Sequence, residues 1–438
     1  MRNFVQIEIE NAEEFAAKLL FWSATFEHVS YLNSNHPQAL GTYDLVVAVD
    51  AITQLRAEEK DNFLKLKKYI GTYKDWLFGH FSYDLKNETE NLVSNNPDGI
   101  RFPELFFFQP RFLFLLRGNK MEVGYLAPFS TEQEVKICIQ EVLSFNIPTH
   151  LVPLNQVDVQ PRLTKDEYIS KVNSIRENIH RGDIYEMNFC MEYFAEHVNI
   201  NPEATYRELN AISQTPFSAF YRVANNYLAS ASPERFLKKA GTHLLSQPIK
   251  GTIRRGTSDA SDQQLKEQLH QNEKDRTENV MVVDIVRNDL ARSAERGSVK
   301  VDELYGIYSF RQVHQMISSI SAELSPEIHF VDAIKNAFPM GSMTGAPKVK
   351  AMELIEEYET TKRGLYSGAV GYITPEGDFD FNVVIRSILY NQTNRYLSFM
   401  VGSAITSKSL PEEEYDECLL KAKAMLEVLH ASHLISST

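Results

Sequence analysis

Acidic residues at helical spacing are the first feature of this sequence that could do chemistry. In the segment KDRTENVMVVDIVRNDLAR, Asp275 and Glu278 stand three positions apart. Near the C-terminus, Glu414 and Glu417 repeat that spacing, and Lys421 follows four positions after Glu417. On one face of a helix, two such carboxylates could share a divalent cation. From spacing alone, the simpler interpretation is a solvated acidic face and an ordinary Glu417–Lys421 ion pair, worth about 0.3–0.5 kcal/mol.

A cationic side chain inside an apolar run is the second such feature. Arg386 lies within FNVVIRSILY, where a guanidinium is costly unless an anion or a hydrogen-bond acceptor meets it. A bidentate carboxylate is the natural partner, and both a structural Asp or Glu and a substrate carboxylate remain open. On the next predicted strand, Gly402 and Ser403 carry small side chains that let backbone N–H groups approach a ligand.

Two further segments place a lysine and a glutamate near strand ends. Glu234 belongs to SASPERF, and Lys250 belongs to SQPIKGTIRRG. A lysine held between Ile249 and Gly251 could lose part of its hydration, which would lower its pKa and make it a nucleophile. The alternative is that Lys250 is solvated, as most lysines are.

A glycine-rich loop, GSMTGAPK at 341–348, precedes a predicted helix at 349–358. Its backbone amides would lie at the positive end of that helix, which suits an anion. A plain connector before a proline-initiated helix explains the same residues equally well. The spacing does not fit a P-loop, and no GxGxxG occurs, so nucleotide binding has no support.

The elements that must position these residues are both helices and strands. A capping box at Thr164 and Glu167 predicts a helix that ends at Gly182. Further helices are expected over 263–296 and from Ser409 onward, and a three-stranded antiparallel meander over 368–374, 378–390 and 395–406. Runs of strands and helices without βαβ alternation predict an α+β fold with antiparallel sheets.

Composition limits the class of protein. The 438 residues are 43% hydrophobic and carry a formal net charge of −13, which argues against a nucleic-acid partner because phosphate contacts need clustered Lys and Arg. Three cysteines without CxxC spacing indicate neither a disulfide framework nor a zinc site, and favour a reducing compartment. No segment is expected to span or target a membrane. We therefore expect a cytoplasmic enzyme without a composition-marked linker or repeat.

In order along the chain, segments from about Thr164 to His430 resemble the chorismate-utilising enzymes, which include anthranilate, aminodeoxychorismate, isochorismate and salicylate synthases. The matching segments are GDIYEMNF, ASPERF, PIKGT, ENVMVVDIVRNDLAR, VHQMIS, FPMGSMTGAPKVKAMELI, GAVGYI, IRS, GSAI and EEEYDECLLKA. The resemblance implies a single large α+β domain of two packed antiparallel β-sheets flanked by helices. Residues 1–150 would be its weakly matching N-terminal part, and 151–438 the chorismate-binding catalytic region.

The resemblance also implies a site. Glu278 and Glu417, with Glu414 and Asp275 nearby, would hold a Mg²⁺ that bridges the ring carboxylate of chorismate. The groups expected to bind the substrate are Arg386, the backbone around Gly402 and Ser403, and Lys421, with Thr344 and His314 lining the same pocket. Glu234 would be the general acid for departure of the C4 hydroxyl.

Within the family, PIKGT resembles the aminodeoxychorismate synthases, whereas anthranilate synthases usually read PIAGT. Lys250 would attack C2 of chorismate, so that ammonia ends at C4, and burial or charge from Arg254 or Arg255 would lower its pKa. Isochorismate and salicylate synthases carry a lysine where this chain has Glu186. Family amination enzymes more often have Gln there, and more often Glu at the position of Asp275.

The sequence contains no recognisable glutaminase Cys-His-Glu set, so ammonia is expected from solution or from a separate glutamine amidotransferase subunit. The expected product, 4-amino-4-deoxychorismate, leads to p-aminobenzoate and folate. The alternatives are an anthranilate synthase component I, an isochorismate synthase, and a non-catalytic chorismate-binding protein.

Overall fold

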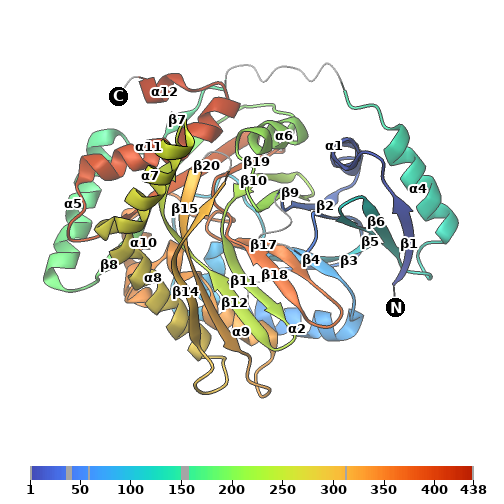
Figure 1. The fold of residues 1–438 in the computed structure, drawn as a ribbon, viewed down its shortest axis with the longest axis horizontal. Helices are drawn as coiled ribbons and strands as arrows, with labels where there is room; N and C mark the ends of the chain where they lie inside the picture. Colours follow the sequence, from blue (N-terminus) through green and yellow to red (C-terminus); the bar gives the residue numbers. More distant parts are fainter. Residues whose placement is uncertain (1, 36–41, 58–59, 149–156, 311–312, 437–438) are drawn as a thin grey trace.

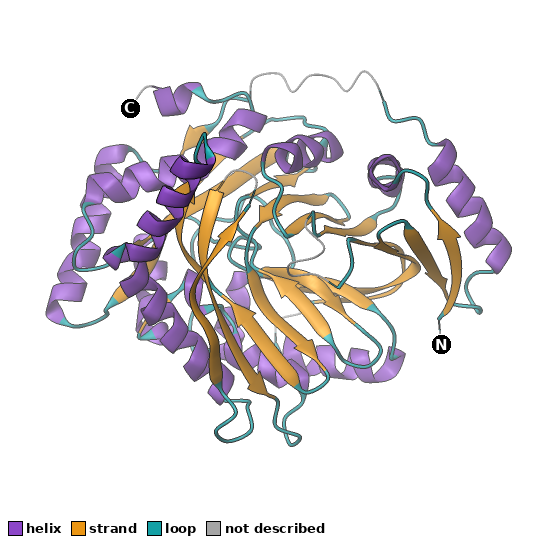
Figure 2. Ribbon diagram, in the orientation of Figure 1, coloured by secondary structure: helices purple, strands orange, loops and turns teal. Residues whose placement is uncertain are grey.

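Strands form the centre of the molecule and helices surround them (Figure 1; Figure 2). The computed structural model describes residues 2–35, 42–57, 60–148, 157–310 and 313–436. The expected boundary between residues 150 and 151 lies outside the described residues. Every strand pair is antiparallel, which confirms the α+β expectation.

A first row of strands runs from the N-terminal strand to the short strands at the edge of β8. Its order is β1 (Asn3–Glu8), β6 (Lys120–Tyr125), β5 (Leu105–Arg117), β3 (Leu45–Arg56), β2 (His28–Asn33), β9 (Phe217–Val223), β10 (Asn226–Ser232), β19 (Ser387–Asn391), β20 (Tyr396–Ile405) and β8 (Glu186–Ala195), which also pairs with β7 (Gln160–Pro161) and β16 (Gly345–Ala346). The contacts of β2 with β9 join the N-terminal part to the rest of the chain.

A second row shares strand β5 with the first. From β5 it continues through β4 (Leu77–Phe81), β17 (Ala369–Ile373), β18 (Phe379–Asn382), β11 (Arg235–Ala240), β12 (His243–Gln247) and β15 (Val313–Glu323), which also pairs with β13 (Ile249–Arg254) and β14 (Lys300–Ser309). The expected pair of packed antiparallel sheets is therefore present, and hydrogen bonds make the two sheets continuous through β5.

Two apolar cores hold these layers together. One lies between the sheets and is rich in aromatic side chains, such as the fully buried Phe78, Phe81 and Phe381. The other lies between the first sheet and its covering helices, where Tyr168 and Leu419 contribute. Because β20 is covered on both faces, all ten of its residues are buried, and its sequence has no polar alternation.

The helices cover the outer faces of the sheets (Figure 2). They are α1 (Ala12–Ser23), α2 (Asn62–Tyr73), α3 (Lys86–Thr89), α4 (Glu132–Ser144), α5 (Lys165–Arg181), α6 (Pro202–Ile212), α7 (Asp259–Gln271), α8 (Glu273–Ala291), α9 (Phe330–Ala337), α10 (Lys348–Tyr358), α11 (Pro411–Val428) and α12 (His433–Ser436), with 3₁₀ turns η1 (Tyr83–Leu85) and η2 (Gly341–Met343). Helix α5 confirms its prediction: Thr164 and Glu167 form the capping box, and Gly182 ends the helix in the left-handed region.

Three expected elements have different bounds in the structure. The helix expected over 263–296 breaks at Asn272, whose side chain accepts from the amide of Asp275 and starts α8. The C-terminal helix begins at Pro411, because the Ser409 hydroxyl closes the preceding turn by contacting Thr406 and Ala404. The strand expected over 378–390 divides into β18 and β19, with Arg386 between them at φ 53°.

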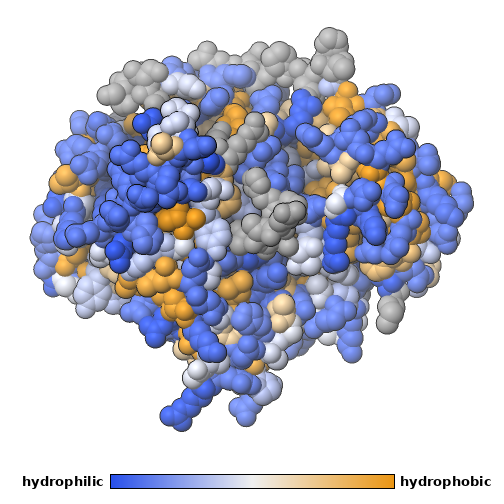
Figure 3. All heavy atoms as spheres, viewed as in Figure 1, coloured by the Kyte–Doolittle hydropathy of each residue, from blue (hydrophilic) through white to orange (hydrophobic). Residues whose placement is uncertain are grey.

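The outer surface mixes polar side chains with scattered apolar ones, and the visible face is mostly hydrophilic (Figure 3). Among the described helices, none is both long enough and apolar enough to cross a membrane.

Candidate functional site

Carboxylates and ammonium groups from four elements meet in one cluster beside the edge of the sheets. Electrostatic contacts link the carboxylates of Glu186, Asp275, Glu278, Glu414 and Glu417 with the ammonium groups of Lys250, Lys274 and Lys421. These groups come from β8, α8, α11 and β13. The five carboxylates face three ammonium groups, so the ionised cluster carries an excess of two negative charges.

Lys250 is held at the centre of this cluster by an ion pair. Its Nζ lies 3.0 Å from Oε1 of Glu186, and both side chains are largely buried. Burial lowers the pKa of Lys250, but the negative charges of Glu186, Glu278 and Glu417 raise it further, so the net pKa lies above its ordinary value. The expected lowering of this pKa is therefore wrong for the enzyme without substrate.

The arginines expected to lower the Lys250 pKa are placed elsewhere. Arg254 is exposed. Arg255 pairs with Asp262 at 2.8 Å and donates to the backbone carbonyl of Phe310. Lys250 therefore has acidic neighbours where basic ones were expected.

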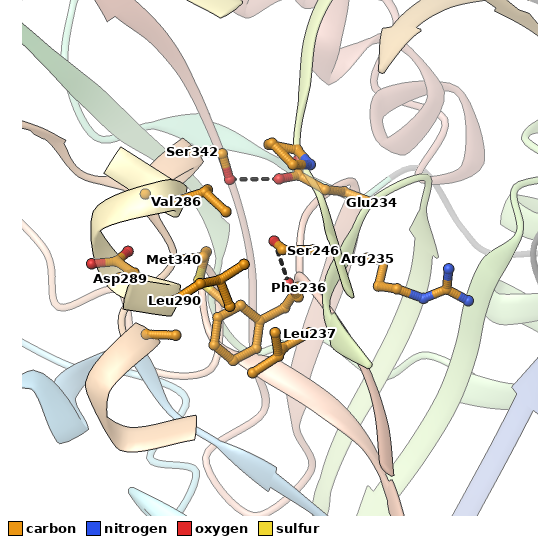
Figure 4. A pocket seen from close by; sticks show the side chains of 13 residues that line it. Glu234, Arg235, Phe236, Leu237, Ser246, Val286, Asp289, Leu290, Met340 and Ser342 are labelled. Carbon is orange, nitrogen blue, oxygen red and sulfur yellow. Dashed lines mark hydrogen bonds between the residues drawn. The ribbon is translucent and has the colours of Figure 1, made fainter. Parts of the chain in front are cut away.

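Glu234 is a buried carboxyl held by a serine. It lies between β10 and β11, is 3% exposed, and accepts a hydrogen bond of 2.5 Å from Ser342. Figure 4 shows this pair, with the apolar side chains of Val286 and Met340 beside it. Burial raises the pKa of Glu234 to about 7, although the Ser342 bond and Lys250 oppose the rise. Near neutral pH, Glu234 can therefore carry a proton and give it away.

The glycine-rich loop at 341–348 positions two of the site carboxylates. Ser342 in turn η2 holds Glu234, and Ala346 in β16 pairs with Glu186 in β8. Gly345 is required there, because a Cβ atom would lie 2.2 Å from the Glu186 carbonyl oxygen. The helix that follows begins at Lys348, one residue earlier than expected.

Two expected metal ligands have buried oxygens without partners. Oε1 of Glu278 and Oε2 of Glu414 accept no hydrogen bond from the described residues. Lys274 Nζ lies between these side chains, 2.9 Å from Oε1 of Glu414 and 3.9 Å from Oε1 of Glu278. Burial raises the pKa of Glu278 to about 7.

These observations test whether the residues suit a metal ion. In the arrangement shown, no three His, Cys, Asp or Glu side chains of the described residues are set to hold one. The donor chemistry nevertheless fits a hard divalent cation, because the oxygens are carboxylates, two lack partners, and the cluster has excess negative charge. Lys274 now neutralises part of that charge.

The other two expected metal ligands flank this pair. Asp275 packs against Gly251, where a Cβ atom on residue 251 would lie 3.0 Å from the Asp275 Cγ. Burial raises the pKa of Asp275. Glu417 forms the i,i+4 ion pair with Lys421 at 2.7 Å, which lowers the Glu417 pKa to about 2. Lys421 also donates to the Gly402 carbonyl at 2.7 Å, so this part of β20 faces the cluster.

Arg386 lines a neighbouring cavity of about 50 Å³. Its guanidinium makes no hydrogen bond or ion pair with any described residue, although its backbone carbonyl accepts from Ala231. Burial lowers its pKa, while nearby Tyr366 and Glu417 raise it. Gln315 lines the same cavity, and its Oε1 is buried without a hydrogen-bond partner. Among the described residues, no carboxylate forms an ion pair with Arg386, although the charge of Glu417 acts on its guanidinium.

Three expected substrate contacts have other partners here. The His314 ring contacts Ser309 and Asp262, each at 2.9 Å, and its neighbour Gln315 lines the Arg386 cavity. The Thr344 hydroxyl donates within its own loop, to Met340 and Gly341. The Ser403 hydroxyl contacts Tyr168 at 3.0 Å, so its side chain faces the outer core. Sequence alone could not tell His314 from Gln315, because adjacent strand residues point to opposite faces.

The structure also brings in residues that were not among the expected catalytic, substrate-binding or metal-binding residues. They are Glu186, which contacts Lys250, Lys274, which contacts Glu414, Ser342, which contacts Glu234, and Gln315. The signals for Lys274 and Ser342 were their positions beside Asp275 and inside the glycine-rich loop. Glu186 contacts a residue 64 positions away, which no local pattern reveals.

Comparisons with known proteins add an independent line of evidence. A family model described as chorismate binding enzyme matches residues 17–427. The chain is 33% identical to aminodeoxychorismate synthase component 1 of Salmonella typhimurium, over 80% of this chain and 76% of that protein. It is 30% identical to anthranilate synthase component 1 of Aquifex aeolicus, over 85% and 80%. The structure of anthranilate synthase component I from Streptococcus pneumoniae matches with a TM-score of 0.77 and 26% identity, covering 87% of this chain and 91% of that one.

Proposed function

The chain belongs to the family of chorismate binding enzymes, and from this premise we propose that it aminates chorismate at C4 to give 4-amino-4-deoxychorismate. The observation that carries the proposal is the position of Lys250, buried between Glu186 and the carboxylates of α8 and α11. A lysine there can attack C2 and block that carbon, so ammonia must add at C4. This product would supply p-aminobenzoate and folate synthesis.

The placement of Arg386 and Lys421 supports a mode of substrate binding. Chorismate carries two carboxylates, and Arg386 offers a planar guanidinium that makes no hydrogen bond or ion pair with any described residue, which suits one of them. Lys421 and the Gly402 backbone lie near Glu417, where the second carboxylate would be held. A Mg²⁺ held by Glu278, Glu414 and Glu417, with Asp275 beside them, would supply the positive charge that binds this carboxylate.

Glu234 provides the proton for the leaving group. With a pKa of about 7, this carboxyl is partly protonated at neutral pH, so it can protonate the C4 hydroxyl as that group departs as water. Ser342 fixes the direction in which the proton is offered. Ammonia then adds at C4 and Lys250 leaves C2. Ammonia would come from a separate glutamine amidotransferase subunit, consistent with the component 1 naming of the Salmonella relative.

Product identity tests the proposal. The purified chain is incubated with chorismate, MgCl₂ and ammonium, and the product is identified by mass and by its conversion with an aminodeoxychorismate lyase. We expect 4-amino-4-deoxychorismate, loss of most activity in Lys250→Ala, and a chorismate adduct on Lys250 when ammonia is left out. If the Lys250→Ala enzyme makes the same product at the wild-type rate, Lys250 is not the nucleophile that attacks C2.

Anthranilate formation is the second candidate. It is favoured by the 30% identity to the Aquifex aeolicus anthranilate synthase component 1, over 85% of this chain. The same assay separates the two functions, because anthranilate is fluorescent and forms without a lyase. Anthranilate as the main wild-type product would replace the proposal above.

A further inference from the structure

Lys250 holds a proton that its proposed role requires it to lose. The ion pair with Glu186, 3.0 Å from Nζ, holds the amine in its charged form in the enzyme without substrate, whereas a nucleophilic lysine attacks through the lone pair of its neutral form. An acceptor must therefore take one proton from Nζ before a carbon–nitrogen bond forms. The inference below rests on the proposed function, because it concerns the step that starts that reaction.

The charged groups around Lys250 leave one acceptor in direct contact. Glu186 Oε1 lies 3.0 Å from Nζ and accepts its hydrogen bond. Glu278 and Glu417 act on Lys250 through charge, without a hydrogen bond to Nζ. Glu234 accepts from Ser342 and is needed in its protonated form. On the far side of Glu186, Oε2 is buried and has no hydrogen-bond partner among the described residues.

We propose that Glu186 is the catalytic base that accepts the proton of Lys250. The ion pair converts to a neutral pair by transfer of one proton along the existing hydrogen bond. Binding of substrate excludes water from the buried pair, and loss of water favours the uncharged form of both an amine and a carboxylate. The transferred proton then lies on Oε1, and the buried Oε2, which accepts no hydrogen bond from the described residues, gives the charged carboxylate no stabilisation that would oppose the transfer.

The bonds and protons balance over the cycle. Lys250 Nζ gives a proton to Glu186 and bonds to C2, the two ring double bonds shift, and the C4–O bond breaks as Glu234 gives its proton to the departing water. Ammonia then bonds to C4, the double bonds shift back, and the C2–Nζ bond breaks. Lys250 leaves as a neutral amine and recovers its proton from Glu186. The new C4 ammonium returns one proton to Glu234, so both carboxyls start the next cycle as they began.

The backbone holds Glu186 where this role needs it. The residue opens β8, and its neighbour in the sheet is Ala346 of the loop that also holds Glu234. Gly345 packs so tightly against this backbone that no other side chain fits. The base therefore lies on a rigid sheet edge, which suits a proton transfer that depends on a short, fixed distance.

The test measures the first half of the reaction by itself. Chorismate and MgCl₂ are mixed with full-length enzyme without ammonia, the reaction is quenched at intervals, and the Lys250 adduct is quantified by intact-protein mass spectrometry. Glu186→Gln keeps the shape of the side chain but cannot take a proton, and we expect its rate of adduct formation to fall about 100-fold. The remaining rate should rise with pH, because solution must then deprotonate Lys250. Glu196→Gln, just beyond the far end of β8 and exposed, is the matched control.

Chemical rescue separates proton transfer from a structural role. Glu186→Ala leaves space beside Lys250, and we expect formate to restore adduct formation in this variant and not in Glu186→Gln. If Glu186→Gln forms the adduct within about twofold of the wild-type rate, or if formate does not rescue Glu186→Ala, the base assignment is wrong. If the wild-type enzyme forms no adduct at Lys250, the result contradicts the proposed function, in which Lys250 attacks C2, and not the base assignment alone.

Discussion

The ammonium group of Lys274 lies 2.9 Å from a carboxylate oxygen of Glu414, whose side chain is almost completely buried. The same ammonium lies 3.9 Å from Glu278. Both carboxylates are proposed ligands of a divalent cation, so Lys274 and the metal ion would compete for the same oxygens.

Removal of this lysine charge should therefore strengthen metal binding. We expect Lys274→Met to bind Mn²⁺ about tenfold more tightly than the wild-type chain, measured by electron paramagnetic resonance without substrate. In EDTA, the same variant should lose about 1–2 kcal/mol of unfolding free energy, because Glu414 stays buried without its partner. Lys266→Met on α7 is the control. Weaker Mn²⁺ binding by Lys274→Met would show that the lysine supports the metal site.

Loss of a carboxylate should have the opposite effect on the metal. Glu278→Gln and Glu417→Gln each replace a charged oxygen ligand by a neutral amide, which binds a hard cation poorly. We expect turnover to fall below detection and the Mg²⁺ concentration for half-maximal activity to rise in any residual activity. Near-normal turnover with unchanged Mg²⁺ dependence in both variants would contradict this placement of the metal.

Arg386→Lys keeps the charge and loses the planar pair of donors. Because the Arg386 guanidinium has no hydrogen bond to any described residue and only the backbone carbonyl of Arg386 accepts one, from Ala231, the variant should fold normally and lose substrate affinity. We expect kcat/KM for chorismate to fall about 10- to 100-fold, the cost of a lost charged hydrogen bond. Wild-type kcat/KM would show that the cavity beside Arg386 does not bind the substrate.

The protonation of Glu234 should set the alkaline limb of the pH profile. Its pKa of about 7 lies above the ordinary 4.5, so the fraction of the acid form falls as pH rises through 7. If the acid form donates the proton, kcat should decline about tenfold per pH unit above this value. Glu234→Gln should lose the limb together with most of the activity.

Ser342→Ala provides a finer test of the same group. The serine hydrogen bond lowers the Glu234 pKa, so its removal should raise that pKa and move the alkaline limb toward higher pH. Rate measurements from pH 6 to pH 10 in both enzymes would detect the shift. A limb that stays in place, or moves toward lower pH, would assign it to another residue.

How much the sequence could predict depended on how local the signal was. Helix α5 was predicted in full, because its capping box and terminal glycine lie within its own 17 residues and their flanks. The interruption at Arg386 was not predicted, because the apolar run around it contains no glycine or proline, whereas the residue itself has a φ of 53°. The charge state of Lys250 depends on Glu186, a partner from another strand. Residue types and spacing thus predicted which side chains could do chemistry. The protonation state of Lys250 could not be predicted, because it depends on a residue far away in the sequence.

The loop at 341–348 has a consequence for how this enzyme can change over evolution. Ser342 fixes the proton donor and Ala346 fixes the backbone of the proposed acceptor, four positions later in the same segment. The separation of the two proton-handling carboxyls is thus encoded by a few adjacent residues. An insertion or deletion of one residue in this segment would change the positions of both carboxyls, Glu234 and Glu186, together. If separate loops held them, the position of each carboxyl could change independently. Both proton-transfer steps therefore constrain the length of the loop at 341–348 during evolution.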